Sequence, residues 1–390
     1  MPSRIAPEGR GWRKLILVAT ATASLSVGAG IASGQGGGIG SSPQSNAANL
    51  EDVQCLKSCA GLRKAGEGSM VKLTGRRLGA VEEVTFKRAQ GSGRIRIEPK
   101  HVEGKKVRAK VPADAASGRV GVIAGSNRAT TPNQLRIVPP RELSDGGKFR
   151  LTEARAAPGR AYFFSAPSRR PRISYVFRGD GATDVRIQVV RLDRNRVVKT
   201  WVHRNRQPLS SHTARWNGRT NKGKIAANGR YRFRVGAVGN GQAETTADSR
   251  FAYYQHTFPV KPKKVGWGDG LGAGRGHQGQ DLFAKCGTKL VAAQGGKVLY
   301  NKFHSAAGYY VIVRGQATGR DYVYMHLKRR SPLKVGKKVR TGQVVGKMGA
   351  TGNASGCHLH FELWSEPGWY QGGSPMRSVT KQLRRWARWS

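Results

Sequence analysis

Four histidines and one aspartate recur at short spacings in the glycine-rich C-terminal part of this 390-residue chain. His277 and Asp281 stand four residues apart, and His358 and His360 stand two apart, so on extended strands each pair shares one face. His326 ends a third strand-like run. Two or three neutral imidazoles and a carboxylate, with one position left open, are typical ligands of a catalytic zinc ion. Because a single metal ion would tie these distant strands together, the five residues constrain the fold more than any other feature.

These residues fall in three motifs, which read His-x-x-x-Asp from position 277, Tyr-x-His-Leu from 324 and His-Leu-His-Phe-Glu from 358. Glycine-rich turns and short strand-like runs lie between the motifs, and no long helical periodicity interrupts them. Over residues 266–364 this order resembles the M23 family of zinc metallopeptidases, the lysostaphin- and LytM-like endopeptidases of peptidoglycan. We therefore expect a mainly antiparallel-β peptidase domain over residues 265–376.

The resemblance implies that His277, Asp281 and His360 bind one zinc ion per chain, and that His326 and His358 are the catalytic pair. It further implies hydrolysis of a peptide bond of peptidoglycan, in the stem peptide or the cross-bridge, by a zinc-activated water. The chain has no His-Glu-x-x-His motif, so a histidine has to take the proton of that water. His358 is the better candidate because it stands next to a ligand, and His326 would stabilise the oxyanion or share the proton.

Two alternatives stay open at the level of the motifs. A chain with this fold could instead be catalytically silent and bind the cell wall or activate another wall hydrolase, although every motif position is filled here. Glu362 shares a strand face with His358 and His360, so it either orients a ligating histidine through a hydrogen bond or has no role at the site.

The formal net charge of +47, from 69 Lys and Arg against 22 Asp and Glu, predicts attraction to polyanions. Basic residues near the start precede an apolar run over residues 15–32 that ends in small residues, which is typical of a secretory signal peptide over residues 1–34. An uncleaved membrane anchor is the alternative. We expect a secreted or cell-envelope protein whose partners are peptidoglycan and anionic envelope polymers. No recognised nucleic-acid fold or motif supports specific nucleic-acid binding.

The chain has four cysteines, all beyond the predicted signal peptide, and an even number in an exported protein favours disulfides. Strand parity would point Cys286 and Cys357 away from the metal face. Because the metal draws their strands together, we expect these two to pair, with Cys357 as a zinc ligand as the alternative. Cys55 and Cys59 are expected to pair locally.

Short alternating runs separated by turn residues precede the motif region and predict a mainly β chain. Residues 35–49 are rich in Gly, Ser and Asn, as in a flexible linker. Residues 50–140 resemble an IPT/TIG-type immunoglobulin-like domain, and residues 144–258 resemble the immunoglobulin-like repeat of flagellar hook-capping proteins. The expected architecture is therefore two immunoglobulin-like β-sandwiches, acting as spacer or presentation modules, followed by the M23-type metallopeptidase domain.

The last segment, residues 378–390, places Val379, Leu383, Trp386 and Trp389 at three- and four-residue steps with Lys and Arg between them. That spacing predicts a short basic amphipathic helix. The helix could pack on the peptidase domain, or it could contact a wall or membrane surface through its basic face.

Overall fold

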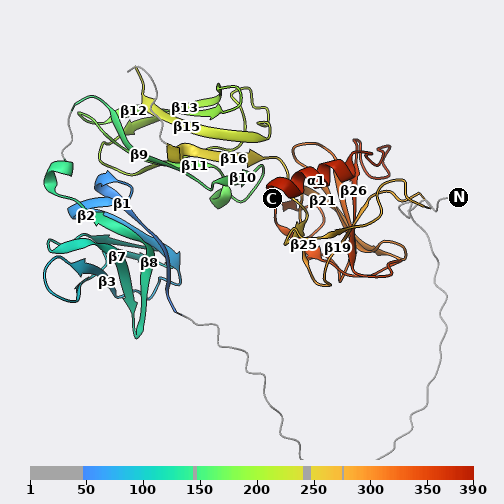
Figure 1. The fold of residues 1–390 in the computed structure, drawn as a ribbon, viewed down its shortest axis with the longest axis horizontal. Helices are drawn as coiled ribbons and strands as arrows, with labels where there is room; N and C mark the ends of the chain where they lie inside the picture. The colour runs from blue at the N-terminus through green and yellow to red at the C-terminus, as the bar shows by residue number, and fades with distance from the viewer. Residues whose placement is uncertain (1–46, 144–146, 240–246, 275) are drawn as a thin grey trace, which may run out of the picture. The chain divides into compact units, whose positions relative to one another are not determined.

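The computed structural model of the protein describes residues 47–143, 147–239, 247–274 and 276–390, which form mainly β-strands (Figure 1). The prediction of a mainly β protein is therefore confirmed. The predicted signal peptide, residues 1–34, and residues 35–46 of the predicted linker lie outside the described residues. Asn49, at the end of the predicted linker, already pairs with Arg76.

The first strands form one eight-stranded sheet in the order β4-β3-β7-β8-β2-β6-β5, with β1 paired to β2. Alternating burial places one face of each strand in a shared core; in β6, Val107 and Ala109 point inward between exposed basic side chains. The strands are β1 (Asn49–Gly61), β2 (Lys64–Arg76), β3 (Glu83–Arg88), β4 (Arg94–Ile97), β5 (His101–Glu103), β6 (Lys106–Lys110), β7 (Ala115–Ala124) and β8 (Asn127–Ile137), followed by the short 3-10 helix η1 (Pro140–Leu143).

The next strands form a five-stranded sheet, β10-β16-β15-β12-β13, and a three-stranded sheet, β14-β11-β9. Ile173 and Tyr175 of the smaller sheet share one core with Ile187 and Phe233 of the larger sheet, so the two sheets pack face to face. The likeness of both N-terminal groups to particular immunoglobulin-like repeats stays a prediction. The elements are β9 (Arg150–Ala157), β10 (Arg160–Tyr162), η2 (Pro167–Arg169), β11 (Arg172–Arg178), β12 (Thr183–Arg191), β13 (Arg196–Arg206), β14 (His212–Arg215), β15 (Gly229–Ala237), η3 (Ala247–Ser249) and β16 (Arg250–Tyr254).

The C-terminal strands form a seven-stranded sheet, β18-β19-β26-β23-β22-β21-β24, and a three-stranded sheet, β17-β20-β25. Both sheets contribute side chains to one hydrophobic core. The strands are β17 (Val260–Lys261), β18 (Gly266–Trp267), β19 (Gln280–Phe283), β20 (Lys289–Val291), β21 (Gly296–His304), β22 (Gly308–Gly315), β23 (Asp321–Leu327), β24 (Lys338–Val339), β25 (Val344–Lys347) and β26 (His358–Trp364).

Strand β26 lies between β19 and β23 and pairs antiparallel with both. Every residue of β23 and of β26 is buried. Histidine and glutamate side chains nevertheless occur on these two strands, where an unpartnered polar group is costly. Three of the motif histidines therefore lie on fully buried strands, where their side chains need polar partners.

A single α-helix, α1 (Val379–Trp389), occurs among the described residues. Val379, Leu383 and Trp386 are buried in the core of the C-terminal sheets, as the three- and four-residue spacing predicts. The apolar face of the tail therefore packs on the C-terminal sheets. Within the described part of the chain, no helix is both long enough and apolar enough to span a membrane.

Both predicted disulfides form: Cys55 with Cys59, and Cys286 with Cys357. No free cysteine remains among the described residues, so Cys357 is not available as a metal ligand. The second bridge joins positions 71 residues apart. Cys286 follows β19 and Cys357 immediately precedes β26, so the bridge ties the two paired strands covalently.

Replacing Cys286 with Ser is expected to lower the free energy of unfolding by about 4 kcal/mol, because the bridge closes a long loop in the unfolded chain. Cys55→Ser, which opens a much shorter loop, is the matched control and should cost about 2 kcal/mol. Denaturant unfolding under non-reducing conditions measures both values. Equal losses in the two variants would contradict the loop-closure explanation.

His256 is a buried histidine outside the motif set, with 6% of its surface exposed. Its ring stacks on Trp386 at a centroid distance of 4.5 Å, and its Nε2 lies 2.7 Å from the Tyr322 hydroxyl and 3.0 Å from the Gln294 amide nitrogen. Burial, together with the charges of Arg320 and Arg385, lowers the pKa of His256 to about 3.

This depressed pKa predicts a loss of stability in acid. Unfolded His256 binds a proton near pH 6.5 and folded His256 does not, so between pH 6.5 and pH 3 protonation favours the unfolded chain. Stability is full above pH 6.5 and falls with pH by about 1.4 kcal/mol per unit from this group. Denaturant unfolding of wild type and His256→Gln from pH 7 to pH 5 should show a shallower pH dependence in the variant. Parallel curves would refute the assignment.

Candidate metal centre and catalytic histidines

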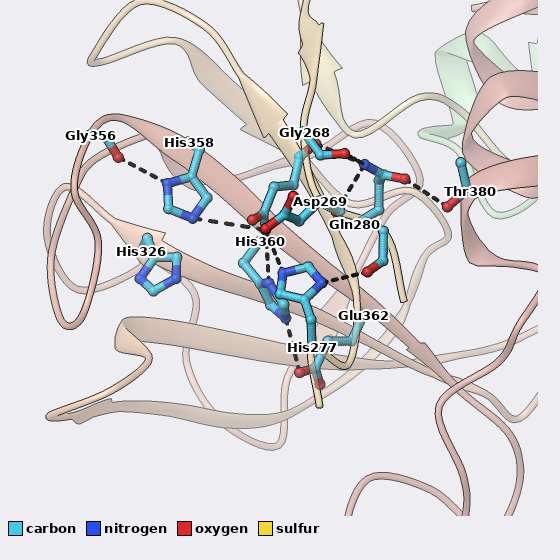
Figure 2. A network of polar contacts seen from close by, with 12 residues as sticks. Gly268, Asp269, His277, Gln280, His326, Gly356, His358, His360, Glu362 and Thr380 are labelled. Atoms are coloured by element: carbon cyan, nitrogen blue, oxygen red, sulfur yellow. Dashed lines mark hydrogen bonds and ion pairs between the residues drawn. The ribbon is translucent and has the colours of Figure 1, made fainter. Parts of the chain in front are cut away.

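The antiparallel register of β19 and β26 sets Asp281 directly opposite His360. Asp281 Oδ1 lies 2.9 Å from His360 Nδ1 and 3.1 Å from His277 Nε2. In this set of three residues each offers a ligand atom, and those atoms all lie within 4.8 Å of one another. Figure 2 shows the imidazoles of His277 and His360 close together, with ring centroids 4.5 Å apart. The structure thus brings together the three residues that the sequence predicts as ligands.

His277 is positioned by the turn that precedes β19. Its Nδ1 lies 2.9 Å from the carbonyl oxygen of Gly270, which can only accept a hydrogen bond, so Nδ1 carries the donated proton. The lone pair of Nε2 then faces Asp281. Although that distance is only 3.1 Å, Nε2 is buried and makes no hydrogen bond. A nitrogen lone pair facing a carboxylate oxygen needs a proton or a cation beside it, which fits a metal ligand.

The segment before β19 is held by the buried side chain of Gln280. Its amide nitrogen donates to the carbonyl oxygens of Gly268 and Asp269, and its Oε1 accepts a hydrogen bond of 2.6 Å from Thr380 of α1 (Figure 2). The terminal helix therefore supports the strand that carries Asp281. Gly279 is also required here, because a Cβ at this position would come within 2.8 Å of His360 Nε2.

The charges in this cluster shift one another strongly. Burial alone would raise the pKa of Asp281, but the close contacts of its carboxylate with His277 and His360 lower it well below its usual range. The contact with Asp281 raises the pKa of His277. Burial would lower the pKa of His360, but Asp281 and Glu362 together raise it to about 9. Asp281 thus stays ionised while the two histidines hold their protons more tightly, so a divalent ion has to displace protons from the imidazoles to bind.

His326 and His358 lie beside this set, with ring centroids 4.5 Å apart. The Nδ1 atoms of both rings lie within hydrogen-bond distance of backbone carbonyl oxygens, 2.8 Å from Thr351 for His326 and 2.9 Å from Gly356 for His358. A carbonyl oxygen accepts, so each Nδ1 donates and each neutral ring keeps an unprotonated Nε2. Two basic nitrogens therefore stand next to the candidate metal ligands.

The two histidines differ in their surroundings. His358 Nε2 lies 3.8 Å from Asp281 Oδ1. Burial lowers the pKa of His326 to about 4, more strongly than its contact with the Thr351 carbonyl raises it. His326 also adopts a left-handed backbone conformation, with φ of 57°, which is unusual for a non-glycine residue and costs energy. His326 is thus held neutral in a constrained position.

Several contacts at this site carry no signal in the motifs. Thr351 and Gly356, whose carbonyl groups set the tautomers of His326 and His358, lie in the loop between β25 and β26. Thr351 also accepts a backbone hydrogen bond from Tyr309 through its hydroxyl group. Phe283, the last residue of β19, is 42% exposed and its ring lies 5.2 Å from that of His358. The spacing of the histidines could not indicate any of these three residues.

Residues 275–374 match Peptidase family M23, so the C-terminal sheets contain a Peptidase M23 domain. The sequence also matches peptidoglycan DD-endopeptidase ShyC of Vibrio cholerae, with 39% identity over 91 residues, which are 23% of this chain and 20% of that protein. Lysostaphin of Staphylococcus simulans is 35% identical over 120 residues, covering 29% of this chain and 24% of its own. This chain therefore spans about a quarter or less of the length of these relatives.

Among solved structures, the catalytic domain of lysostaphin from Staphylococcus simulans matches with 28% sequence identity. The match covers 31% of this chain and 92% of that domain, with a TM-score of 0.27. ShyC and the glycyl-glycine endopeptidase ALE-1 of Staphylococcus capitis are both named as endopeptidases, and the name of ShyC specifies peptidoglycan as its substrate. The family match lies in the C-terminal part of the chain.

Proposed function

We propose that this chain is a secreted zinc metallo-endopeptidase that hydrolyses peptide bonds of peptidoglycan. The observation that carries the proposal is the convergence of His277, Asp281 and His360 beside the His326–His358 pair. A metal-binding set alone would fit a silent or structural role. Two neutral imidazoles with unprotonated Nε2 atoms beside it are the additional groups that hydrolysis of an amide requires.

His277 Nε2, Asp281 and His360 Nδ1 would hold the zinc ion. Zinc bound there would lower the pKa of a coordinated water to about 7 and polarise the scissile carbonyl group. His358 Nε2 would take the proton of the attacking water, because the Gly356 carbonyl engages Nδ1 and leaves Nε2 as the accepting atom, 3.8 Å from Asp281 Oδ1. His358 would then return this proton to the leaving amine.

His326 has a different task in this proposal. Burial disfavours its charged form, so it would stay neutral until negative charge develops on the scissile oxygen. It would share the proton with His358, whose ring centroid lies 4.5 Å away, and so help to stabilise that oxyanion. The Thr351 carbonyl keeps the ring oriented throughout.

Digestion of purified peptidoglycan tests the proposal. Wild type should release fragments with new amine and carboxyl ends, read by mass spectrometry, and their masses name the bond that is cut. His360→Ala should release none, because it removes a ligand. His358→Ala should be slower by about 10²–10⁴-fold, the usual contribution of a general base. His101→Gln, a change at an exposed histidine in the first sheet, is the control and should behave as wild type.

If wild type cleaves no wall preparation but binds zinc, the chain is instead a silent wall-binding protein or an activator of another wall hydrolase. Export, through the predicted signal peptide over residues 1–34, is part of the proposal and can be read from the mature N-terminus of secreted protein. A mature chain that still begins at Met1 in the membrane fraction would support the anchor alternative.

We further propose that anionic envelope polymers hold the protein at the wall. The net charge of +47 supports this, and the sheet β14-β11-β9 adds a local feature. Arg215 of β14 lies directly opposite Arg172 of β11, and Arg155 of β9 lies opposite Ser174. Like charges in directly opposite positions destabilise a sheet, and a bound anion would relieve that cost.

Wall binding should therefore weaken with salt, since raising ionic strength from about 0.1 M to about 1 M shortens the Debye length from about 10 Å to about 3 Å. Sedimentation with wall fragments measures the bound fraction. Arg172→Gln/Arg215→Gln should bind less tightly than Arg76→Gln/Arg191→Gln, which removes the same charge from arginines already paired with acids. Salt-independent binding, or equal binding by the two double variants, would count against this role.

A further inference from the structure

Glu362 is a buried carboxylate within the M23 domain, with 2% of its surface exposed. Its Oε2 accepts hydrogen bonds from two indole nitrogens, Trp364 Nε1 at 2.7 Å and Trp369 Nε1 at 3.0 Å. Its Oε1 lies 3.1 Å from His360 Nε2, a contact that Figure 2 draws. Among the described residues, His360 is the only basic side chain within ion-pair distance of Glu362.

These contacts fix the direction of each hydrogen bond. An indole N–H can only donate, so Oε2 has to accept from both tryptophans and carries no proton. Oε1 is left to face His360, and the two groups form a hydrogen bond when His360 Nε2 donates. A neutral His360 with its proton on Nε2 keeps the lone pair on Nδ1. That Nδ1 is the atom 2.9 Å from Asp281 and within the ligand cluster.

We infer that Glu362 is a positioning residue for the metal centre: it selects the His360 tautomer that presents Nδ1 to the metal. This inference rests on the proposed zinc site but not on which bond the enzyme cuts. Trp364 and Trp369 orient Glu362 in turn, so the loop after β26 takes part in ligand placement although it reaches no ligand directly.

The experiment uses the full mature chain and its Glu362→Gln variant, with Zn²⁺ affinity measured by competition with a chromophoric chelator. Glutamine has the same shape, and its oxygen can still accept from both indoles. Its amide nitrogen would then donate to His360 Nε2, which moves the imidazole proton to Nδ1 and blocks the ligand atom. Zinc affinity should fall by about 10- to 100-fold, as for other partners of ligating histidines.

Three further measurements separate positioning from a merely structural role. The metal-free melting temperature of Glu362→Gln should stay close to that of wild type, while the rise on adding zinc shrinks. Trp369→Phe, which removes one donor but keeps the carboxylate, should lose less zinc affinity than Glu362→Gln. Nitrogen-15 spectra of zinc-loaded wild type should show His360 protonated at Nε2, and this reading holds even if a variant fails to fold.

Wild-type zinc affinity in a folded Glu362→Gln variant overturns the inference, and so does a zinc-loaded wild type in which His360 is protonated at Nδ1. These readouts do not involve peptidoglycan. A protein that needs Glu362 for zinc but cleaves no wall would refute the proposed function and leave the inference standing. Cleavage of peptidoglycan by a Glu362→Gln variant with unchanged zinc affinity would support the proposed function and refute the inference.

Discussion

The candidate site depends on the pairing of β26 with the strands on either side of it. The register with β19 sets Asp281 opposite His360, and pairing with β23 on the other edge brings His326 to the same region. A shift of one residue in either register would turn the polar side chains of one strand to the opposite face. Backbone hydrogen bonds between strands thus bring together side chains that are as far apart in the chain as His277 and His360, and the chemistry of the site depends on that placement.

Burial and hydrogen bonding determine which ring nitrogen of each histidine is available. Each motif histidine is at least half buried, and each has one ring nitrogen directed to a defined acceptor: Gly270 for His277, Thr351 for His326, Gly356 for His358 and Glu362 for His360. For His277, His358 and His360 the other ring nitrogen lies 3.1 Å, 3.8 Å and 2.9 Å, respectively, from Asp281 Oδ1. The surrounding carbonyl and carboxylate oxygens therefore decide which atom of each ring is available, as well as where the ring lies.

The sequence predicted the features that depend on local or periodic patterns. Cys286 and Cys357 form the predicted bridge, although both lie just outside the strands whose parity suggested it. The three- and four-residue spacing predicts the buried face of α1. Contacts between distant segments could not be predicted, because Trp369 reaches Glu362, and Thr351 reaches His326, only through loops without a periodic pattern. The division of work between His326 and His358 likewise depends on burial and on Asp281, neither of which the motif spacing describes.

The bridge between Cys286 and Cys357 links the site to the redox state of its surroundings. It ties the two strands that carry Asp281, His358 and His360, and such bridges persist outside the reducing cytosol. A chain still inside the cell would hold these strands by hydrogen bonds and packing alone. The covalent constraint would be added after export, in the compartment where the proposed substrate lies. Oxidation would then be a final assembly step. The site would be more rigid in the exported protein than in the chain inside the cell.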